Sequence, residues 1–320
     1  MKKTILLSVC LFVASLSTFG ASLSSIMLQH NGSVTMYESD KMSTAISNAV
    51  KGDTIYLSEG SFVGDFTINK EITIIGAGQL TIVQGNITIA IDNTPTLTAH
   101  LLDAIKVPSS FNVTVTKAIK NLKIRKCYIN QLNCNNSVTD LSLDRCNLYY
   151  FYPKTNVKSG NLFNCYLYEI WGESGMLNTI NYINCSIYDI YNYNACFAGT
   201  LINSIIKDSY GSSIKNCSFI NTAYPTGFSF DASSSRQNCY AGGFTWTSYT
   251  EEGTGVSYST VDSDWLESNN YKGTDGTIIG LFGGSIPYSL VPNVPTVTES
   301  KVSVDTATKK LNVTLKVTAN

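Results

Sequence analysis

The segments LDRCNLYYFY (143–152), LFNCYLYEIW (162–171) and YINCSIYDIY (182–191) repeat one pattern at intervals of 19 and 20 residues. In each, a Cys is followed after two positions by an apolar residue and after three by a tyrosine. A related copy, IRKCYINQLN (124–133), comes before them, and LINSIIKDSY (201–210) follows with Ser in the Cys position. Short alternating runs repeated at this interval are typical of a solenoid in which each copy forms one turn.

The residue before the Cys position predicts where each turn bends. It is Asn164, Asn184 and Asn203 in successive copies, and Lys126 and Arg145 in the two earlier ones. Asn tolerates the left-handed backbone conformation of a tight bend better than most other residues that carry a side chain. One such bend per turn predicts an all-β fold, a right-handed parallel β-helix with neighbouring turns roughly 4.8 Å apart.

Two later Asn-Cys pairs extend the pattern. Asn216-Cys217 and Asn238-Cys239 follow after less regular gaps, and we assign both to the same column. The column is then a stack of small buried side chains, which favours free thiols. Stacked disulfides are the alternative in an exported protein. A metal site is disfavoured, because there is no Cys-x-x-Cys pair and both histidines lie outside the repeat.

The N-terminus predicts export. Lys2 and Lys3 precede a short apolar core, Ile5 to Val13, and small residues near position 20 suit cleavage, so residues 1–20 form a predicted signal peptide. The expected localisation is periplasmic, cell-surface or extracellular. No later segment is apolar for long enough to predict a transmembrane helix. Only 14% of the 320 residues are charged, without a basic run, so nucleic-acid binding is not expected.

The β-helix is expected over residues 21–286, with a capping helix near its start. The helix is predicted to end at Gly52, and its apolar face would cover the open end of the core. That face is formed by Met42, Ala45, Ile46, Ala49 and Val50. Residues 93–113 lack a regular pattern and are expected to loop out. Three prolines mark a linker over residues 287–296, and residues 297–320 predict a β-hairpin tail that docks on the last turns.

Two stretches carry a resemblance. AISNAVKGDTIYL (45–57), followed by ITIIGAG (72–78), resembles the start of pectate-lyase-like β-helix proteins. DGTIIGLFGGSIPY (275–288) resembles the closing segment of exported β-helix proteins of gut Bacteroidetes. The resemblance covers most of the chain and implies the fold. That superfamily includes polysaccharide lyases, glycoside hydrolases and adhesins, and its catalytic residues find no match here position by position, so activity stays open.

Outside the predicted core, the repeat forms two aromatic files with an acidic column between them. Three positions after the Cys position stand Tyr149, Tyr168 and Tyr188, and then Lys207. Six positions after it stand Tyr152, Trp171, Tyr191 and Tyr210. The column between them holds Tyr150, Glu169, Asp189 and Asp208.

These columns admit three interpretations. Rings repeated at the spacing of the turns predict a surface that stacks on sugar faces, with carboxylates accepting hydrogen bonds from hydroxyls. A glycoside hydrolase would use two of the three acids, and a lyase would need Lys207 as its base and Ca²⁺ on the acids. Alternatively, the ladders only stabilise the solenoid.

The function predicted from the sequence is therefore binding of a polysaccharide through the aromatic face of an exported protein, without a cofactor. A polysaccharide lyase or glycoside hydrolase that uses Glu169, Asp189, Asp208 or Lys207 is one alternative. A structural or adhesive solenoid that recognises a cell-surface protein is the other.

Overall fold

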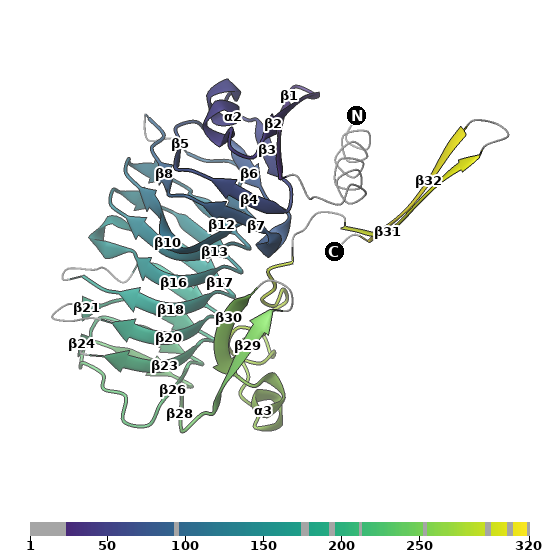
Figure 1. Ribbon diagram of the computed structural model, residues 1–320. Coiled ribbons are helices and arrows are strands. Elements are labelled where there is room, and N and C mark those ends of the chain that lie inside the picture. The colour runs from purple at the N-terminus through teal and green to yellow at the C-terminus, as the bar shows by residue number, and fades with distance from the viewer. Residues whose placement is uncertain are drawn as a thin grey trace.

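The chain forms a parallel β-solenoid of about 9 turns, which confirms the predicted β-helix architecture (Figure 1). The computed structural model describes residues 24–92, 96–173, 179–191, 196–210, 213–251, 255–291, 296–305 and 310–318. The predicted signal peptide lies outside these residues.

Two twelve-stranded sheets form the walls of the solenoid. Sheet A contains β1 (Ser25–His30), β2 (Ser33–Glu38), β3 (Thr54–Leu57), β6 (Thr73–Ile75), β9 (Leu102–Asp103), β12 (Lys123–Arg125), β15 (Leu141–Asp144), β17 (Gly160–Phe163), β19 (Ile180–Ile183), β22 (Thr200–Ile202), β25 (Ser218–Ile220) and β27 (Ser235–Gln237). Sheet B contains β4 (Gly60–Val63), β5 (Phe66–Ile68), β7 (Thr81–Gln84), β8 (Ile87–Ile89), β10 (Lys106–Val115), β13 (Tyr128–Cys134), β16 (Asn147–Tyr152), β18 (Tyr166–Trp171), β20 (Ser186–Tyr191), β23 (Ile205–Tyr210), β26 (Ala223–Tyr224) and β28 (Tyr240–Ala241).

Smaller elements complete the fold. Short parallel pairs form between β11 (Ile119–Lys120) and β14 (Val138–Thr139), and between β21 (Cys196–Phe197) and β24 (Ser213–Ile214). Antiparallel hairpins are β29 (Trp246–Glu251) with β30 (Val256–Val261), and β31 (Thr296–Asp305) with β32 (Lys310–Thr318). The helices are α2 (Met42–Asn48), α3 (Ser263–Ser268) and the 3₁₀ turns η1 (Gly78–Leu80) and η2 (Lys154–Asn156).

The core follows the register that the repeat predicts. Leu148 pairs with Leu167, Leu167 with Ile187, and Ile187 with Ile206, each across adjacent parallel strands of sheet B. All four side chains are fully buried. Equivalent positions of successive turns therefore stack into apolar columns, and the core extends along one axis.

The predicted bend is also present. Lys126, Arg145, Asn164, Asn184 and Asn203 all have φ between 48° and 52°. The column then continues differently from our prediction. The register between β22 and β25 places the next bend at Asn221, which has a φ of 46°, and the buried Thr222 takes the Cys position.

Our assignment of Cys217 to the Cys column is therefore wrong, whereas Cys239 does belong to it. Ser218 pairs with Thr200, so Cys217 stacks at the level of Gly199, one strand earlier in the turn. The sequence misled because Asn216 also forms a left-handed bend (φ 52°), but at a different corner.

The described cysteine side chains are free thiols, seven in all. They are Cys127, Cys134, Cys146, Cys165, Cys185, Cys217 and Cys239. Burial raises the pKa of Cys165 well above its ordinary value, and its Sγ lies 3.3 Å from the carbonyl oxygen of Phe163. The column therefore consists of small, packed side chains.

Helix α2 covers the N-terminal end of the core. Met42, Ala45 and Ile46 are buried, as predicted, but the helix stops at Asn48 and Val50 is 48% exposed, so its place on the predicted apolar face is wrong. Lys70 satisfies the carbonyl groups at this end. Its Nζ donates hydrogen bonds to the carbonyl oxygens of residues 46, 47 and 49, the groups that a helix C-terminus leaves without partners.

The expectation that residues 93–113 loop out is also wrong for the described part. Residues 102–103 and 106–115 form strands of sheets A and B, and Leu101 and Leu102 are fully buried. The pairing with β13 shifts register between Val107 and Asn112, which marks a β-bulge. The bulge lengthens this turn, so the interval of the repeat is not kept in the sequence here.

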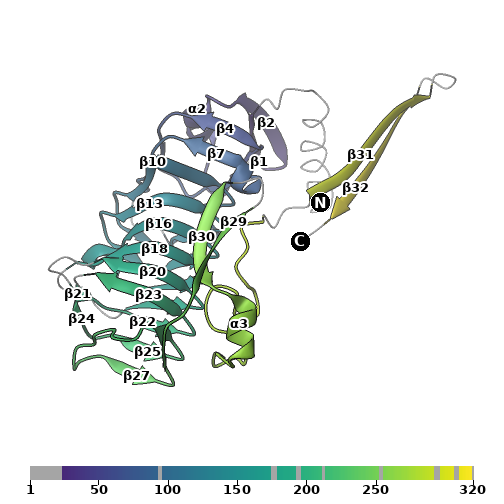
Figure 2. The ribbon, with the colours of Figure 1, turned by 60° about the horizontal axis from the view of Figure 1, so that its bottom comes forward.

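The last turn of the solenoid ends at β28, and the chain then folds back. Hairpin β29–β30, helix α3 and residues 271–291 lie along one side of the solenoid, running back towards its N-terminal end (Figure 2). The predicted C-terminal hairpin is present as β31–β32. In both views it projects away from the last turns, so the expected docking there is wrong.

Candidate functional site

The first aromatic file, Tyr149, Tyr168 and Tyr188, is a stack of nearly parallel rings on the outside of sheet B. The ring centroids of Tyr149 and Tyr168 are 4.3 Å apart at an interplanar angle of 14°, and those of Tyr168 and Tyr188 are 4.8 Å apart at 19°. The Nζ of Lys207 lies 3.6 Å from the centroid of Tyr188 and closes the stack with a cation–π contact.

This stacking changes what the file can offer to a ligand. Because each ring covers the face of the next, the faces are largely occupied by the file itself. All three tyrosines are half-buried, and their edges and hydroxyl groups are left to meet solvent. The hydroxyl of Tyr149 also interacts with those of Tyr150 and Tyr168. The first file therefore presents hydroxyl groups and ring edges, rather than the flat platform that the sequence predicts.

The second file, Tyr152, Trp171 and Tyr191, is less regular. The centroids of Tyr152 and Trp171 are 5.4 Å apart at 24°, while Trp171 and Tyr191 are 4.2 Å apart and tilted by 46°. A tilt of this size leaves part of the ring faces uncovered, so this file is the better surface for a sugar ring. The side chain of Tyr210, predicted for the same file, lies outside the described residues.

Between the files, the acids occupy equivalent positions on adjacent strands. Glu169 pairs with Asp189, and Asp189 with Asp208, in the parallel register of β18, β20 and β23. Glu169 accepts a hydrogen bond of 3.0 Å from Nε1 of Trp171, which joins the acidic column to the second file. Partial burial raises the pKa of Glu169, and the nearby Asp189 adds to the effect.

Hairpin β29–β30 forms a wall beside the first file, which the sequence did not predict. Ser186 and Thr260 share a hydrogen bond of 2.6 Å, and Nδ2 of Asn147 donates to the carbonyl oxygen of residue 257 at 3.2 Å. Trp246 packs edge-on against Tyr188 with centroids 6.0 Å apart. Tyr166 of β18 also packs against Tyr258. The wall is thus attached to three successive strands, β16, β18 and β20.

A second unpredicted element, the strap (residues 271–291), covers the bend of the solenoid next to the wall. Nδ2 of Asn164 donates to the carbonyl oxygens of Leu281 (3.1 Å) and Gly283 (2.7 Å). Oδ1 of Asn203 accepts a hydrogen bond from the backbone N–H of Thr274 at 3.0 Å. The asparagines that allow the bend therefore also bind the returning chain.

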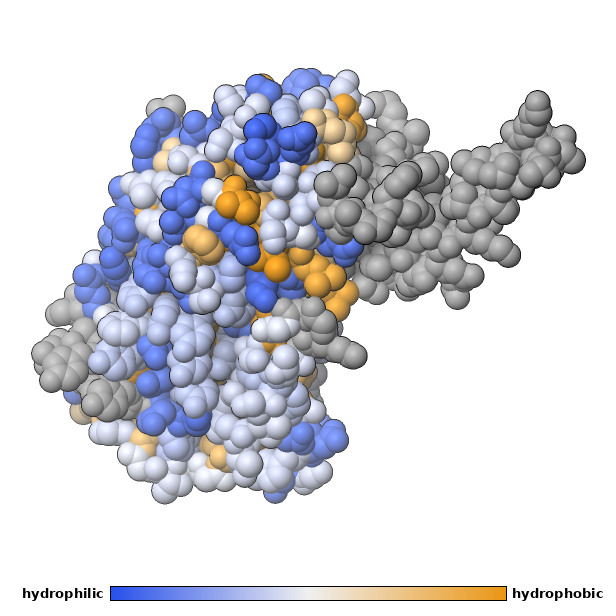
Figure 3. Space-filling view, viewed as in Figure 1, coloured by the Kyte–Doolittle hydropathy of each residue, from blue (hydrophilic) through white to orange (hydrophobic). Residues whose placement is uncertain are grey.

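The wall and the strap meet in one apolar cluster over sheet B. Its buried members are Tyr166, Val256, Leu281, Tyr288 and Leu290, and its half-buried members include Tyr168 and Tyr188. The first file is therefore fixed on one side by the returning chain. Figure 3 shows the face beside it mainly in pale colours, as expected for a surface of Tyr, Trp, Ser and Thr.

Of the predicted catalytic arrangement, the structure brings together the acids, which lie on adjacent strands. No group of three or more His, Cys, Asp and Glu side chains in that part of the chain is placed to hold a metal ion. Lys207, the predicted base, lies over the ring of Tyr188 in the first file. The roles assigned to Glu169, Asp189, Asp208 and Lys207 in catalysis remain predictions.

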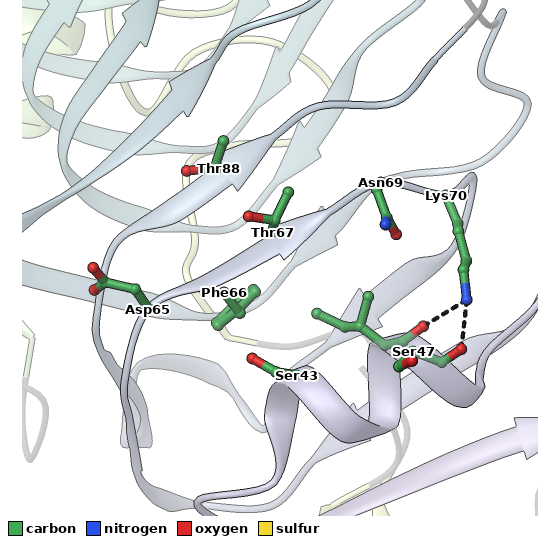
Figure 4. A pocket seen from close by; sticks show the side chains of 9 residues that line it. Ser43, Ser47, Asp65, Phe66, Thr67, Asn69, Lys70 and Thr88 are labelled. Atoms are coloured by element: carbon green, nitrogen blue, oxygen red, sulfur yellow. Dashed lines mark hydrogen bonds between the residues drawn. The ribbon is translucent and has the colours of Figure 1, made fainter.

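A pocket of about 450 Å³ lies elsewhere, between α2 and the strands β5 and β8 (Figure 4). It is lined mainly by hydroxyl and amide groups, with Asp65 at one side. Its one cation, Lys70, points to the end of α2, where the helix carbonyls occupy it. This pocket follows from the way the cap is attached, and it brings no catalytic pair together.

Comparison with known proteins gives no relative. No protein-family model matches the chain, and no curated protein and no solved structure matches it. The β-solenoid is thus shown by the structure itself. In the described part of the chain, no helix has the length and apolar character needed to span a membrane.

Proposed function

We propose that this protein binds a polysaccharide through the aromatic face formed by the two files and the acidic column. One observation carries the proposal. Two successive turns present, in register, a tyrosine, an acid and a second aromatic residue on the outside of sheet B, and the turn before them carries three tyrosines. The half-exposed hydroxyls, carboxylates and indole would offer a ligand similar groups in successive turns.

The arrangement supplies the two kinds of contact that carbohydrate recognition uses. Hydroxyl groups of the first file and the carboxylates can exchange hydrogen bonds with sugar hydroxyls, which often involves bridging water. The tilted rings of Trp171 and Tyr191 offer partly open apolar faces for the C–H side of a sugar. Because the side chains are held by stacked strands, little conformational entropy is lost on binding.

Export and ancestry belong to the same proposal. Residues 1–20 favour a secreted protein that meets polysaccharides outside the cytoplasm. Residues 45–57 and 72–78 favour a distant relationship to pectate-lyase-like β-helix proteins, many of which act on polysaccharides. Neither point depends on whether this chain is an enzyme.

The test is a glycan-binding screen with matched tryptophan variants. Trp171→Ala removes the central ring of the second file, whereas Trp265→Ala removes a 37% exposed tryptophan on α3, away from the face. Losing one ring contact costs about 1 kcal/mol, so Trp171→Ala should weaken binding roughly five-fold in titration calorimetry. The control should bind as the parent does.

Two results would overturn the proposal. One is a folded parent that binds nothing in a broad panel of plant, host and microbial polysaccharides. The other is a Trp171→Ala variant that binds as tightly as the parent. Mass spectrometry of the same mixtures decides between binding and cleavage, because hydrolysis adds water to the products and a lyase leaves them unsaturated.

A further inference from the structure

The aromatic face is elongated along the axis of the solenoid. The residues at its equivalent positions lie on β16, β18, β20 and β23, which stack along the solenoid axis. The wall runs the same way, since Thr260 contacts Ser186 of β20 while Gly255, at the other end, comes close to Lys106 of β10. A long ligand beside this wall has room to extend parallel to the axis rather than across the strands.

The spacing of the turns fits a sugar chain in that orientation. Strands in a sheet are about 4.8 Å apart, and an extended pyranose chain advances by a similar distance for each sugar. Each turn can therefore serve as one subsite of the same composition. The most complete subsites are the turn of Tyr168, Glu169 and Trp171 and the turn of Tyr188, Asp189 and Tyr191.

The charge of the face restricts the sugar. A ligand aligned with the axis would pass Glu169, Asp189 and Asp208 in succession, one carboxylate per turn. Lys207, the only cation in these columns, is placed over the Tyr188 ring. A polyuronate would set one negative charge against each of these acids, and repulsion between like charges at this spacing is unfavourable.

We infer that the ligand of this face is a non-acidic polysaccharide, extended parallel to the solenoid axis with one sugar per turn, and that amine-bearing sugars bind best. The inference rests on the proposed function and narrows it to a substrate class. Protonated sugar amines would pair with the carboxylate column, while neutral sugars would use the rings and hydroxyl groups alone. The face thus selects against acidic polysaccharides.

The test compares three hexasaccharides by titration calorimetry at low salt and mildly acidic pH. The probes are oligoglucosamine with free amines, neutral cello-oligosaccharide and oligogalacturonate. Affinity should fall in that order, and added salt should weaken the first most strongly. Shorter oligoglucosamines should bind progressively less tightly, from four sugars down to two, as subsites are left empty.

Asp189→Asn tests the acidic column directly. It should weaken oligoglucosamine binding about three- to five-fold and leave the neutral ligand unchanged, because only the charge is removed. Asp264→Asn is the matched control, since it makes the same change of net charge on an exposed residue of α3. Thermal unfolding of each variant checks that the fold is retained.

The outcomes separate this inference from the proposed function. Oligogalacturonate that binds as well as the neutral ligand, and that depends on Trp171, overturns the substrate class and leaves polysaccharide binding in place. Equal effects of Asp189→Asn and Asp264→Asn also overturn it, because net charge alone would then explain the preference. No binding by any of the three probes or by the broad panel overturns the proposed function itself.

Discussion

Asn164 joins the bend of the solenoid to the strap, and replacing it should separate the two roles of this asparagine. Its φ of 48° supports the bend, while its Nδ2 holds the carbonyl oxygens of Leu281 and Gly283. Asn164→Gly retains the freedom to adopt the left-handed conformation and removes only the contacts with the strap. Asn164→Ala removes the contacts and also disfavours the bend.

The expected losses follow from these contacts. Each of the two hydrogen bonds contributes about 1 kcal/mol, and a buried carbonyl without a donor adds a cost of similar size. Asn164→Gly should therefore lower the free energy of unfolding by about 2–3 kcal/mol. Alanine in a left-handed bend costs about 1 kcal/mol more, which gives about 3–4 kcal/mol for Asn164→Ala.

Asn238 provides the matched control. It has the same backbone conformation (φ 50°) in a later turn, and its side chain is exposed. Asn238→Ala should cost only about 1 kcal/mol, the price of the bend alone. Urea unfolding followed by circular dichroism measures the losses, provided that the transition is cooperative in the parent and in each variant.

Hydrogen exchange gives the local part of the same test. Amides of residues 271–291 should exchange faster in Asn164→Gly, while those of the stacked strands should not change. Equal losses of stability in Asn164→Ala and Asn238→Ala, with unchanged exchange in the strap, would refute the reasoning. The asparagine column would then serve the bend alone, and the wall beside the aromatic face would be held by its apolar contacts.

Three further predictions address single residues. The hydroxyl of Tyr182 is fully buried and makes no hydrogen bond to the described residues, so Tyr182→Phe should leave urea stability unchanged or raise it by up to about 1 kcal/mol; a clear loss would show a hidden partner. The pKa of Glu169 is raised in the folded protein, so the protonated carboxyl stabilises the fold below pH 4.5, and this contribution is lost as the pH rises through the pKa of the folded state. In Glu169→Gln the melting temperature should therefore change less with pH in that window than in the parent. Parallel curves of melting temperature against pH for the two proteins would argue against this. Gly280 has a φ of 84°, and a Cβ there would lie 2.6 Å from Cδ1 of Ile205, so Gly280→Ala should lower urea stability by about 1–3 kcal/mol. Alanine at Gly243, an exposed glycine outside any helix or strand, should cost less than about 1 kcal/mol.

The repeated turns could be predicted because their information is local. A left-handed residue such as Asn184 and a short run such as Ser186 to Tyr191 together specify one bend and one strand. Stacking then follows, since an unpaired strand edge finds its partner about 20 residues away in the next copy. The aromatic files lie on the outside of the strands that carry the core columns, although the alternation is broken there, because two outward residues follow each other in every strand of this face.

Prediction weakened wherever the length of a turn changed. The bulge between Val107 and Asn112 lengthens one turn, and the turn from Ser204 to Thr222 replaces the expected Cys by another small buried residue. Both changes keep the core filled and the strands paired, so they cost the fold little. They remove the constant interval on which a search for repeats depends, and Cys217 then took the place of Thr222 in our assignment.

The orientation of the rings could not be predicted from the pattern of residues. The pattern of the repeat indicates on which side of a strand a ring lies, but not whether the face of the ring meets solvent or the next ring. In the first file each tyrosine gains more from its neighbour than from water, because parallel rings at 4.3–4.8 Å fit the spacing of the turns. In the second file, Trp171 lies at 24° to Tyr152 but at 46° to Tyr191, so the stack is interrupted at Tyr191.

Two glycines of the strap have a role that becomes clear only from the structure. A Cβ at Gly273 would lie 2.6 Å from Cγ of Asn203, and one at Gly284 would lie 2.4 Å from Nδ2 of Asn184. These glycines are therefore needed for a close approach to the asparagine column some 70 to 100 residues earlier, and not for the local turn alone. A glycine-rich segment after a β-helix with an asparagine column thus predicts a returning chain that packs on that column. In this protein such a chain places the wall beside the aromatic face, so the geometry of the site depends on residues that lie outside the repeat altogether.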